Sequence, residues 1–456
     1  MATELSRTSW GGLAIGAPAR PGGFFRVAQS AGVWWLIDPD GGRFLSKGVN
    51  TVRFDQDCIL NTGRIPYAEA CHRKYRSHAA WQSAAARRLS SWGFNTLGAW
   101  SDPAVRGAGA SRLALTPNLD LGASFKERTR SGGEPSQAFP DVFDVQFAAH
   151  ARSRAGELCA PLRQDPSVIG WFTDNELRWG PDWRGSDELL TVFLNLPGSS
   201  PGRRAAIAFL AERYRQFDDF NAVWRTTARS WEALPAIPRL MAPYRRGTVY
   251  ERDPAVERAS NSADLGRAAF VGDCDAFSGA LARRYFEITK AAIRDADPNH
   301  MLLGCRFAYV PEPVVLAAAA GSVDVISFNC YGFDPTAPID AYAATGKPCI
   351  NTEFSFRSED SGLPNTIGAA PQVATQADRA RCFRHYVSAG LRRPSLVGYH
   401  WFEHADQPAE GRFDGENSNY GIVTIGDEVY EDLARTMTAV NEEADEIHSV
   451  PAQLAA

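Results

Sequence analysis

One stretch, VIGWFTDNELRWG at Val168–Gly180, constrains the fold of this chain more than any other. It begins as apolar as a buried strand and stops abruptly on polar residues that end in Glu176. A carboxylate buried there would cost several kcal/mol unless it were paired or hydrogen-bonded. A second stretch, KPCINTEFS at Lys347–Ser355, stops in the same way on Glu353. Either strand end alone is compatible with an ordinary polar turn, but the pair indicates strand ends that meet at one polar face.

The alternation of strands and helices predicts the rest of the architecture. Eight segments have the pattern of strands, and most are separated by helices, which is typical of an α/β protein and favours a (β/α)8 TIM barrel. A doubly wound open sheet is the competing architecture. It would normally carry a phosphate loop or a dinucleotide fingerprint after the first strand, and GVNTVRF has neither. The predicted strands are Arg43–Asn50, Phe94–Ser101, Leu113–Leu121, Val168–Glu176, Met301–Arg306, Val323–Asn329, Pro348–Glu353 and Leu396–Glu403.

The same pattern sets the expected domain boundaries. We expect a flexible leader at 1–22, a single catalytic barrel domain at 23–448 and a tail at 449–456. A helical insertion at 181–270 breaks the rhythm after the fourth strand, and we expect it to lean over the top of the barrel. Its alternative is a lid with a purely structural role.

Short-range signals predict the remaining elements. An antiparallel hairpin, Phe24–Val27 with Val33–Ile37, should cover the barrel floor, because Asp38-Pro39-Asp40-Gly41-Gly42 supplies a turn. Loops are expected at 54–80 and 122–138. The predicted helices are Trp81–Trp92, Val145–Leu162, Pro201–Phe217, Phe277–Ala296, Gln376–Ala389 and 427–448. Thr375 with Asp378 has the spacing of a capping box and marks the start of the fifth of these helices.

Composition limits the classes of function. Of 456 residues, 44% are apolar and 22% are charged, and the net charge of -5 gives no reason to expect nucleic acid or a membrane surface as a partner. The first residues lack the apolar core of a secretory signal, and no apolar run reaches the roughly 18 residues of a membrane span. We therefore expect a cytoplasmic protein. Secretion with removal of a signal is the alternative.

The potential metal ligands are scattered along the chain. None of the eight cysteines forms a close pair with zinc-ligand spacing, and we expect all of them to be reduced. A disulfide between Cys58 and Cys71 is the less favoured alternative. The His, Asp and Glu residues also show no convincing metal spacing. The sequence thus predicts neither a metal nor a cofactor.

The two strand-end carboxylates carry the predicted chemistry. In a parallel barrel the carboxyl ends of all strands converge on one face, so Glu176 and Glu353 should meet across the mouth. Retaining glycosidases place two such groups about 5–5.5 Å apart. One protonates the leaving oxygen, and the other attacks the anomeric carbon. We assign Glu176 as general acid/base and Glu353 as nucleophile.

These two roles require different surroundings. The acid must be protonated near neutral pH, so its pKa must be raised, whereas the nucleophile must stay ionised and needs donors around it. Arg306, Asn329 and Tyr331, from the fifth and sixth strands, are the candidate donors.

The motif around Glu176 and Glu353 resembles the clan A pattern of retaining glycoside hydrolases. By that resemblance Asn175 holds the sugar 2-hydroxyl, Tyr331 in FNCYG donates to the nucleophile, and Trp401 in YHWFE floors the sugar subsite.

A narrower resemblance is to glycoside hydrolase family 50, the β-agarases, over about residues 24 to 445. It rests on WWLIDPDGGRFLSKGVN, FPDVFD, IGWFTDNELRWG and DGENSNYGIV. The segment AFLAERYRQFDDFNAVWRTTARSWEAL is similar to the helical insertion of family 42 β-galactosidases. Agarases usually carry a carbohydrate-binding-like domain before the barrel, whereas here the hairpin begins almost at once, so we expect a small or soluble oligosaccharide rather than a polymer.

Further polar and aromatic residues are weaker candidates for contacts with sugar hydroxyls. Each also has a plain interpretation as loop capping or ion pairing, and Asp174 is expected either to hydrogen-bond behind the site or to turn into an ion pair. The candidates are Asn50, Arg53, Trp100, His400, Glu403 and Asn417.

Together these features predict a retaining β-glycoside hydrolase for β-galactosides or agar-type oligosaccharides. A β-glucoside or uronic-acid specificity, transglycosylation, and a sugar-binding protein without catalysis are the alternatives. The expected partner is an oligosaccharide, with a homo-oligomer also possible. The sequence leaves the linkage and exo or endo action open.

Overall fold

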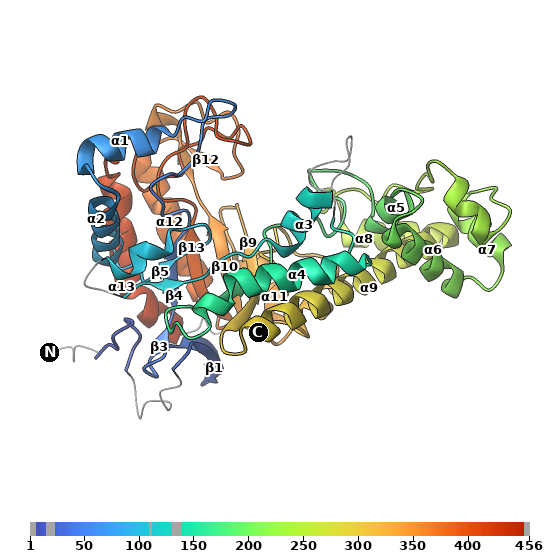
Figure 1. The fold of residues 1–456 in the computed structure, drawn as a ribbon, viewed down its shortest axis with the longest axis horizontal. Coiled ribbons are helices and arrows are strands. Elements are labelled where there is room, and N and C mark those ends of the chain that lie inside the picture. The colour runs from blue at the N-terminus through green and yellow to red at the C-terminus, as the bar shows by residue number, and fades with distance from the viewer. Residues whose placement is uncertain (1–5, 15–22, 109–111, 130–138, 451–456) are drawn as a thin grey trace.

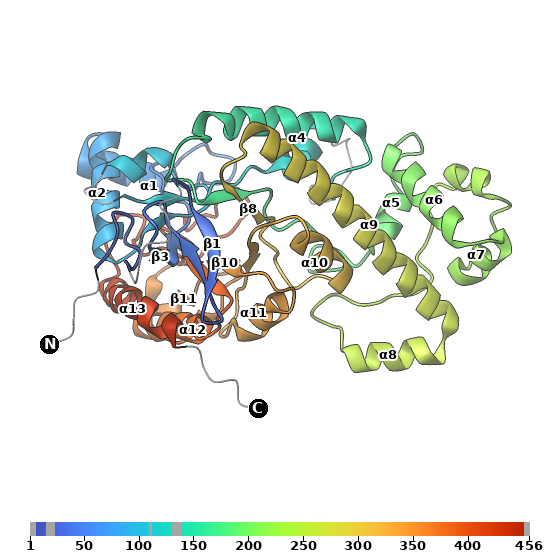
Figure 2. The ribbon, with the colours of Figure 1, turned by 90° about the horizontal axis from the view of Figure 1, so that it is seen from below.

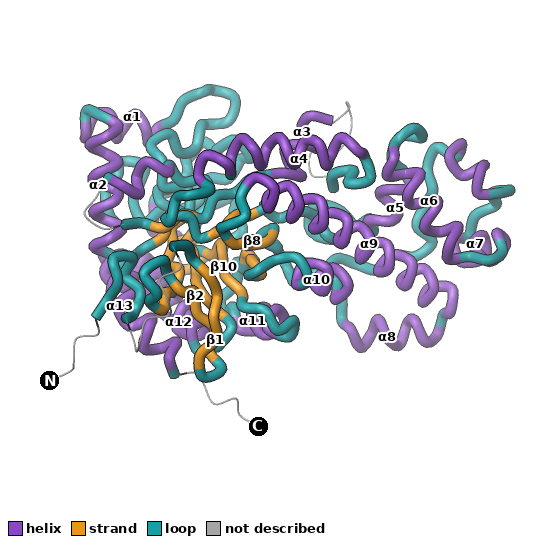
Figure 3. Tube along the Cα trace, turned by 60° about the horizontal axis from the view of Figure 1, so that its bottom comes forward, coloured by secondary structure: helices purple, strands orange, loops and turns teal. Residues whose placement is uncertain are grey.

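The computed structural model describes residues 6–14, 23–108, 112–129 and 139–450. It has a body in which strands lie at the centre with helices around them, and a helical arm that extends from one side (Figures 1 and 3). The predicted tail from 451 onward, and residues 1–5 and 15–22 of the predicted leader, lie outside the described residues.

The centre of the body is a six-stranded parallel sheet with the order β6-β5-β4-β13-β10-β9. Strands β7 and β8 form a separate two-stranded parallel sheet, which brings the number of parallel strands in these two sheets to eight. Each of the eight predicted strands overlaps one of these observed strands, and the α/β class is confirmed. Seven of the observed strands are shorter than predicted, and β10 has the predicted length but is shifted by one residue. Their bounds are β4 Ser46–Val49, β5 Thr96–Leu97, β6 Ala114–Leu115, β7 Gly170–Phe172, β8 Met301–Gly304, β9 Ile326–Asn329, β10 Cys349–Phe354 and β13 Leu396–Trp401.

Single parallel bridges connect the two sheets. Leu115 pairs with Val168 between β6 and β7, and Phe307 pairs with Phe328 between the chain after β8 and β9. The amide of Ile169 donates to Leu115 O at 2.9 Å, and the amide of Phe307 donates to Ser327 O at 3.0 Å. Both outer strands of the six-stranded sheet, β6 and β9, are thus hydrogen-bonded to the segment of β7 or β8.

The predicted hairpin is present and packs on one end of the parallel strands. It consists of β1 (Arg26–Ser30) and β2 (Val33–Ile37), with β3 (Arg43–Phe44) added to β2, all antiparallel. Apolar side chains of this unit form one cluster with side chains from the parallel strands, among them Phe172, Met301, Val325, Ile350 and Val397. The hairpin therefore covers this end of the strands and excludes water from it.

Part of the predicted flexible leader is packed rather than free. Leu13 bridges to Arg43, Trp10 is 4% exposed and packs against Phe25, and Arg7 forms an ion pair with Asp445 at 2.8 Å. The reason is apolar burial, because Trp10 and Leu13 extend the cluster beneath the hairpin and the strands.

The helices cover the outside of the strands. The capping box that begins α12 is formed as predicted, with Thr375 and Asp378 each accepting a backbone N–H. The helices of the body are α1 Pro66–Tyr75, α2 His78–Ser91, α3 Leu121–Thr129, α4 Val145–Leu158, α9 Leu265–Ala296, α10 Pro313–Ala320, α11 Thr336–Ala343, α12 Gln376–Leu391 and α13 Glu431–Ser449. Short 3-10 helices lie at Pro103–Gly107, Ala160–Leu162 and Glu359–Ser361, and a small parallel pair joins β11 (Arg357–Ser358) to β12 (Gln372–Val373).

Four helical segments differ from the sequence predictions. The loop expected at 54–80 contains α1, which begins at Pro66, a residue suited to the first turn of a helix. The loop expected at 122–138 contains most of α3, and residues 130–138 lie outside the described part. We predicted neither α10 nor α11. Helix α10 reads PVVLAAAA and has no polar face, so it gives no amphipathic period to detect.

The insertion after β7 forms the arm. Figures 1 and 2 show α6 and α7 at the outer end of the long helix α9, away from the strands, so the bulk of the insertion does not lie over the strand ends. Asp273 of α9 is buried and accepts hydrogen bonds from the side chains of Trp224 and Tyr214 in the arm. These bonds hold the arm against α9. The arm contains α5 Leu189–Leu194, α6 Pro201–Arg213, α7 Phe217–Trp224, a 3-10 helix at Trp231–Ala236 and α8 Pro254–Ala263.

All eight cysteines are free thiols, so the alternative of a Cys58–Cys71 disulfide is wrong. Within the described ranges, no helix is both long and apolar enough to cross a membrane.

Candidate active site

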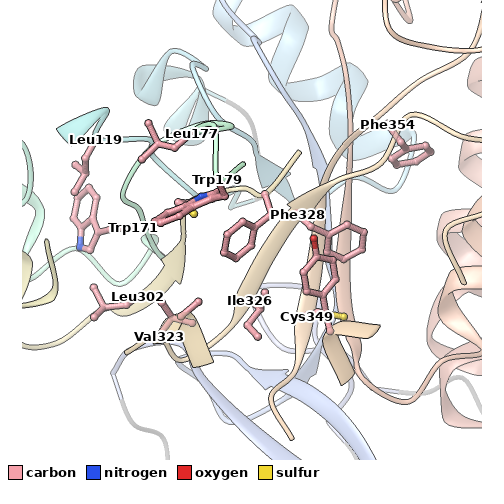
Figure 4. Close-up of a cluster of buried hydrophobic side chains, with 14 of the residues drawn as sticks. Leu119, Trp171, Leu177, Trp179, Leu302, Val323, Ile326, Phe328, Cys349 and Phe354 are labelled. Atoms are coloured by element: carbon pink, nitrogen blue, oxygen red, sulfur yellow. The ribbon is translucent and has the colours of Figure 1, made fainter. Parts of the chain in front are cut away.

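Glu176 lies directly after β7, on a turn that is fixed from both sides. Its φ is 53°, and its amide donates to the carbonyl oxygens of Cys305 and Arg306. The residues that follow it, Leu177 and Trp179, insert into the hydrophobic core (Figure 4). Trp179 stacks on Phe286 of α9, with 5.6 Å between the ring centroids. Because the turn is anchored in this way, the carboxyl group has a defined direction.

The carboxyl group of Glu176 has one specific hydrogen-bond donor. Asn329 Nδ2, at the end of β9, donates to Glu176 Oε1 at 2.7 Å and to Asn175 Oδ1 at 3.2 Å. Burial, with the charge of Glu353 as a second cause, raises the pKa of Glu176 to about 7, although the Asn329 hydrogen bond lowers it. A carboxyl group in these surroundings holds a proton near neutral pH.

Glu353 lies within β10, with a hydrogen-bond donor at one carboxylate oxygen and an ion-pair partner at the other. Tyr331 Oη donates to Oε2 at 2.7 Å, and Arg306 Nη2 lies 2.8 Å from Oε1. The guanidinium of Arg306 is fully buried, lies 4.5 Å from the centroid of the Trp100 ring and donates to Thr352 Oγ1 and Thr352 O. Glu353 is therefore held in one orientation by a cation that cannot move away.

Five left-handed residues mark this end of the strands. Thr51, Trp100, Asp120, Glu176 and Arg306 follow β4, β5, β6, β7 and β8, and their φ values lie between 50° and 59°. A non-glycine residue with positive φ is uncommon and costs on the order of 1–3 kcal/mol, so such residues persist where the surroundings impose them. Their concentration after five successive parallel strands points to this end of the sheet as the functional one.

Two adjoining cavities open at the same end. The first has a volume of about 640 Å³ and the second about 710 Å³. Glu353 lines the first cavity only, whereas Glu176 and Tyr331 line both. The residues shared by the two cavities are Glu176, Trp183, Tyr331, Ala369 and Glu416.

The hydroxyl of Tyr331 provides a direct test of this arrangement. We expect Tyr331→Phe to lower kcat about 10- to 100-fold with little change in KM, because a hydrogen bond to a charged group contributes roughly 1.5–3 kcal/mol. The matched control is Tyr399→Phe, which removes a buried hydroxyl bonded to Asn441 and lies at neither cavity. Steady-state kinetics of both variants are the measurement. An equal fall in kcat in Tyr331→Phe and Tyr399→Phe would contradict a specific role for the Tyr331 hydroxyl.

Six of the thirteen predicted site residues line the first cavity, and two more support the carboxyl groups. Asn175, Arg53 and Trp100 line the first cavity. Asn329 lines the second cavity, and Arg306 lies behind Glu353. The six that line the first cavity are Arg53, Trp100, Asn175, Glu176, Tyr331 and Glu353.

The expectation that Trp401 floors the sugar subsite is wrong. Trp401 is fully buried, lies 5.8 Å from the ring of Phe383 of α12, and donates from Nε1 to Tyr420 O at 2.9 Å. Side chains alternate along a strand, so Trp401 shares the helix-facing side of β13 with Tyr399, which also packs on Phe383. The next residue, Phe402, lines the first cavity instead.

The remaining predicted contacts with sugar line neither of the two cavities. Asn50 donates to Thr352 O and Trp401 O and accepts from the amide of Ala99, so it connects four strand ends. His400 pairs with Ser46 Oγ at 2.8 Å inside the strands, and burial lowers its pKa to about 3. Asn417 accepts from the amides of Thr366 and Ile367 and fixes that loop.

Glu403 belongs to a charged cluster behind the first cavity. It is fully buried, and burial raises its pKa well above the usual value. Arg412, which lines the cavity, lies 3.6 Å from Glu403, 3.8 Å from Asp57 and 2.8 Å from Glu416. We did not identify this cluster from sequence, although DGENSNYGIV begins two residues after Arg412.

Asp174 hydrogen-bonds behind the site, which is one of the two arrangements expected for it. Its carboxyl accepts from the amides of Gly122 and Ala123, at the start of α3, and from Tyr285 Oη. Burial raises its pKa to about 7, helped by the charge of Asp120. Asp174 therefore connects the Glu176 turn to α3.

Sequence reasoning also missed three residues of the insertion. Trp183, Arg184 and Tyr250 line the cavities, and the signal available for two of them was GPDWRG directly after the fourth strand. Among the residues that the structure describes, no group of three or more His, Cys, Asp or Glu side chains could hold a metal ion.

No family model matches the sequence. The chain is 28% identical over 505 residues to β-agarase B of Vibrio sp. (strain JT0107), covering 96% of this chain and 50% of that protein. It is 30% identical over 492 residues to β-agarase A of the same strain, covering 93% of this chain and 46% of that protein. The chain thus spans about half the length of these curated relatives.

Solved structures give the same result. The crystal structure of an agarase, AgWH50C, superposes with a TM-score of 0.79 at 26% identity, over 97% of this chain and 68% of that one. PfGH50B gives a TM-score of 0.78 at 26% identity, over 97% and 69%. An exo-β-agarase at 23% identity shares the fold, with a TM-score of 0.79. Sequence and structure therefore both show that this chain is similar to the β-agarases, in agreement with the resemblance of four sequence segments to that family.

Proposed function

We propose that this chain is a retaining β-glycoside hydrolase that acts on β-galactoside or agar-type oligosaccharides. The observation that carries the proposal is the pair of carboxyl groups on the first cavity, one with a raised pKa and one held by a tyrosine hydroxyl and a buried guanidinium. Similarity to β-agarases A and B supports the substrate class.

The proposal includes closure of the strands into a (β/α)8 barrel. Closure is supported by the order of the six-stranded sheet together with the bridges from Leu115 to Val168 and from Phe307 to Phe328. With β7 and β8 between β6 and β9, the strand ends would form one ring around the carboxyl groups. The single catalytic domain that we propose is this barrel with the arm as its insertion.

The proposed reaction has two displacements. In the first, a carboxylate oxygen of Glu353 attacks the anomeric carbon while Glu176 gives its proton to the glycosidic oxygen, which leaves with the bonding electron pair. In the second, Glu176, now ionised, takes a proton from water, and the hydroxide oxygen displaces Glu353. Asn329 keeps Glu176 Oε1 occupied, so the other oxygen carries the proton. Arg306 and Tyr331 stabilise Glu353 each time it leaves as an anion.

The charges of the first cavity favour a neutral sugar over a uronic acid. Each arginine on its lining already has a carboxylate partner: Arg53 pairs with Asp55, Arg184 with Asp182, and Arg412 with Glu416. A sugar carboxylate would have to displace one of these partners and leave it unpaired. Sugar hydroxyls can instead bond to the carboxylates and guanidiniums as they stand.

The experiment that tests the function is proton NMR of the first product. We expect an aryl β-galactoside or a neoagaro-oligosaccharide to release the β-anomer first, with the α-anomer forming only by slow mutarotation. We also expect a 2-deoxy-2-fluoro glycoside to label Glu353, located by peptide mass spectrometry. Initial release of the α-anomer would exclude the retaining mechanism. Binding of the sugar without turnover would favour the alternative of a non-catalytic protein.

A further inference from the structure

The two cavities differ in chemistry. The lining of the first includes Arg53, Asp55, Asp57, Arg184, Arg412, Asp414 and Glu416, which suit a sugar bound through many hydroxyl groups. The lining of the second includes Tyr250, Ala308, Tyr309, Val310 and Tyr342, together with Trp183, which it shares with the first, and these side chains suit a ring bound through its C–H face. A chain of sugars that crosses both cavities would therefore meet different surroundings on the two sides of Glu176.

The positions of the carboxyl groups give this chain of sugars a direction. Glu353 lines only the first cavity, so the sugar whose anomeric carbon it attacks must lie there. Glu176 lines both cavities, as expected for a group that protonates the oxygen between two sugars. The unit that leaves with this oxygen must then extend into the second cavity.

Two rings of the insertion stand at the edge of this second cavity. The side chain of Trp183 is 56% exposed and that of Tyr250 is 66% exposed, and their centroids lie 6.2 Å apart. Exposed large aromatic groups that adjoin a cavity beside catalytic groups are typical of ligand contacts rather than of packing. We call Trp183 and Tyr250 the aromatic platform.

The segments that carry the aromatic platform are fixed relative to Glu176. Arg184 lies 4.4 Å from the centroid of the Trp183 ring and donates to Glu176 O at 2.5 Å. The amide of Val249, next to Tyr250, donates to Pro181 O at 3.1 Å. Arg246 and Arg252 flank Tyr250 in sequence, and their nearly buried side chains both pair with Glu312. The platform is thus held in place before substrate arrives.

We propose that the aromatic platform binds the sugar unit that leaves in the first displacement, and so sets a preference for oligosaccharides over glycosides with small leaving groups. The proposal rests on the proposed function and deepens it. It makes Trp183 and Tyr250 specificity-determining residues, and it gives the insertion a role in substrate choice. The ligand is a pyranose or similar ring that presents an apolar face.

The test compares two substrates with the same sugar in the first cavity. One is the oligosaccharide, and the other is the corresponding β-glycosyl fluoride, whose leaving group is a single atom. For Trp183→Ala and Tyr250→Ala we expect kcat/KM on the oligosaccharide to fall about tenfold, the size of one lost aromatic contact. The fall on the fluoride should be several-fold smaller.

Two matched variants complete the design. Phe413 lines the first cavity and is 66% exposed. Removing its ring in Phe413→Ala should lower kcat/KM equally on both substrates. Phe333 is 55% exposed and lines neither cavity. Phe333→Ala should therefore leave kcat/KM unchanged on both substrates. If kcat/KM of Trp183→Ala and Tyr250→Ala fell equally on both substrates, or did not fall at all, the proposed role of the aromatic platform would be refuted. A parent protein that is inactive on both substrates would instead refute the proposed function.

Discussion

Replacing Glu353 by alanine is expected to lower kcat on an aryl β-galactoside by on the order of 10⁶-fold, the scale found when a nucleophile is removed from another hydrolase. The physical reason is that no other carboxylate on the first cavity is held by both a buried guanidinium and a tyrosine hydroxyl. The variant also leaves Arg306 buried without its carboxylate partner, so its thermal unfolding must be measured beside its rate.

Azide distinguishes loss of the nucleophile from loss of the fold. A small anion can enter the space left by the Glu353 side chain and attack the anomeric carbon directly, so Glu353→Ala should regain activity with azide and form the α-glycosyl azide. The Glu353→Gln variant fills that space and should not be rescued. A folded Glu353→Ala protein that keeps more than about a hundredth of the parent rate would refute the nucleophile assignment.

Glu176→Ala is expected to give the second large loss of activity, and the size of the fall in kcat/KM should depend on the leaving group of the substrate. On an oligosaccharide, whose leaving oxygen needs a proton, kcat/KM should fall about 10²- to 10⁴-fold. On an aryl glycoside with an acidic phenol the first displacement should be much less affected. Azide should yield the β-glycosyl azide, opposite to the product of Glu353→Ala. The same anomer from both variants would contradict the assignment of the two roles.

The pH profile provides an independent check on Glu176. Its pKa is raised to about 7, mainly by burial, and the acid acts in its protonated form, so kcat/KM of the parent should fall as pH rises through about 7. In Glu176→Gln this alkaline limb should disappear. Asn329→Ala removes the hydrogen bond that opposes the raised pKa, so the limb should move to higher pH. An unchanged limb in Glu176→Gln would assign it to another group.

The sequence by itself determined the parallel strands and their polar ends. Period and length located all eight parallel strands, because burial on both faces demands continuous apolar runs. The same runs stop where the chain meets water, which is why Glu176 and Glu353 could be identified as carboxylates at one end. The capping box at Thr375 and Asp378 was also visible, since it depends only on residues three apart.

Only the tertiary structure decided which side chains reach the cavities. Trp401 and Phe402 are neighbours, yet one is buried against α12 and the other faces the first cavity, because the direction of each side chain depends on where the strand stops. Trp183 and Tyr250 are 67 positions apart and meet through contacts of the arm with itself and with α9. Cavities form where loops from distant segments fail to fill space, and the local sequence carries no period that reports this.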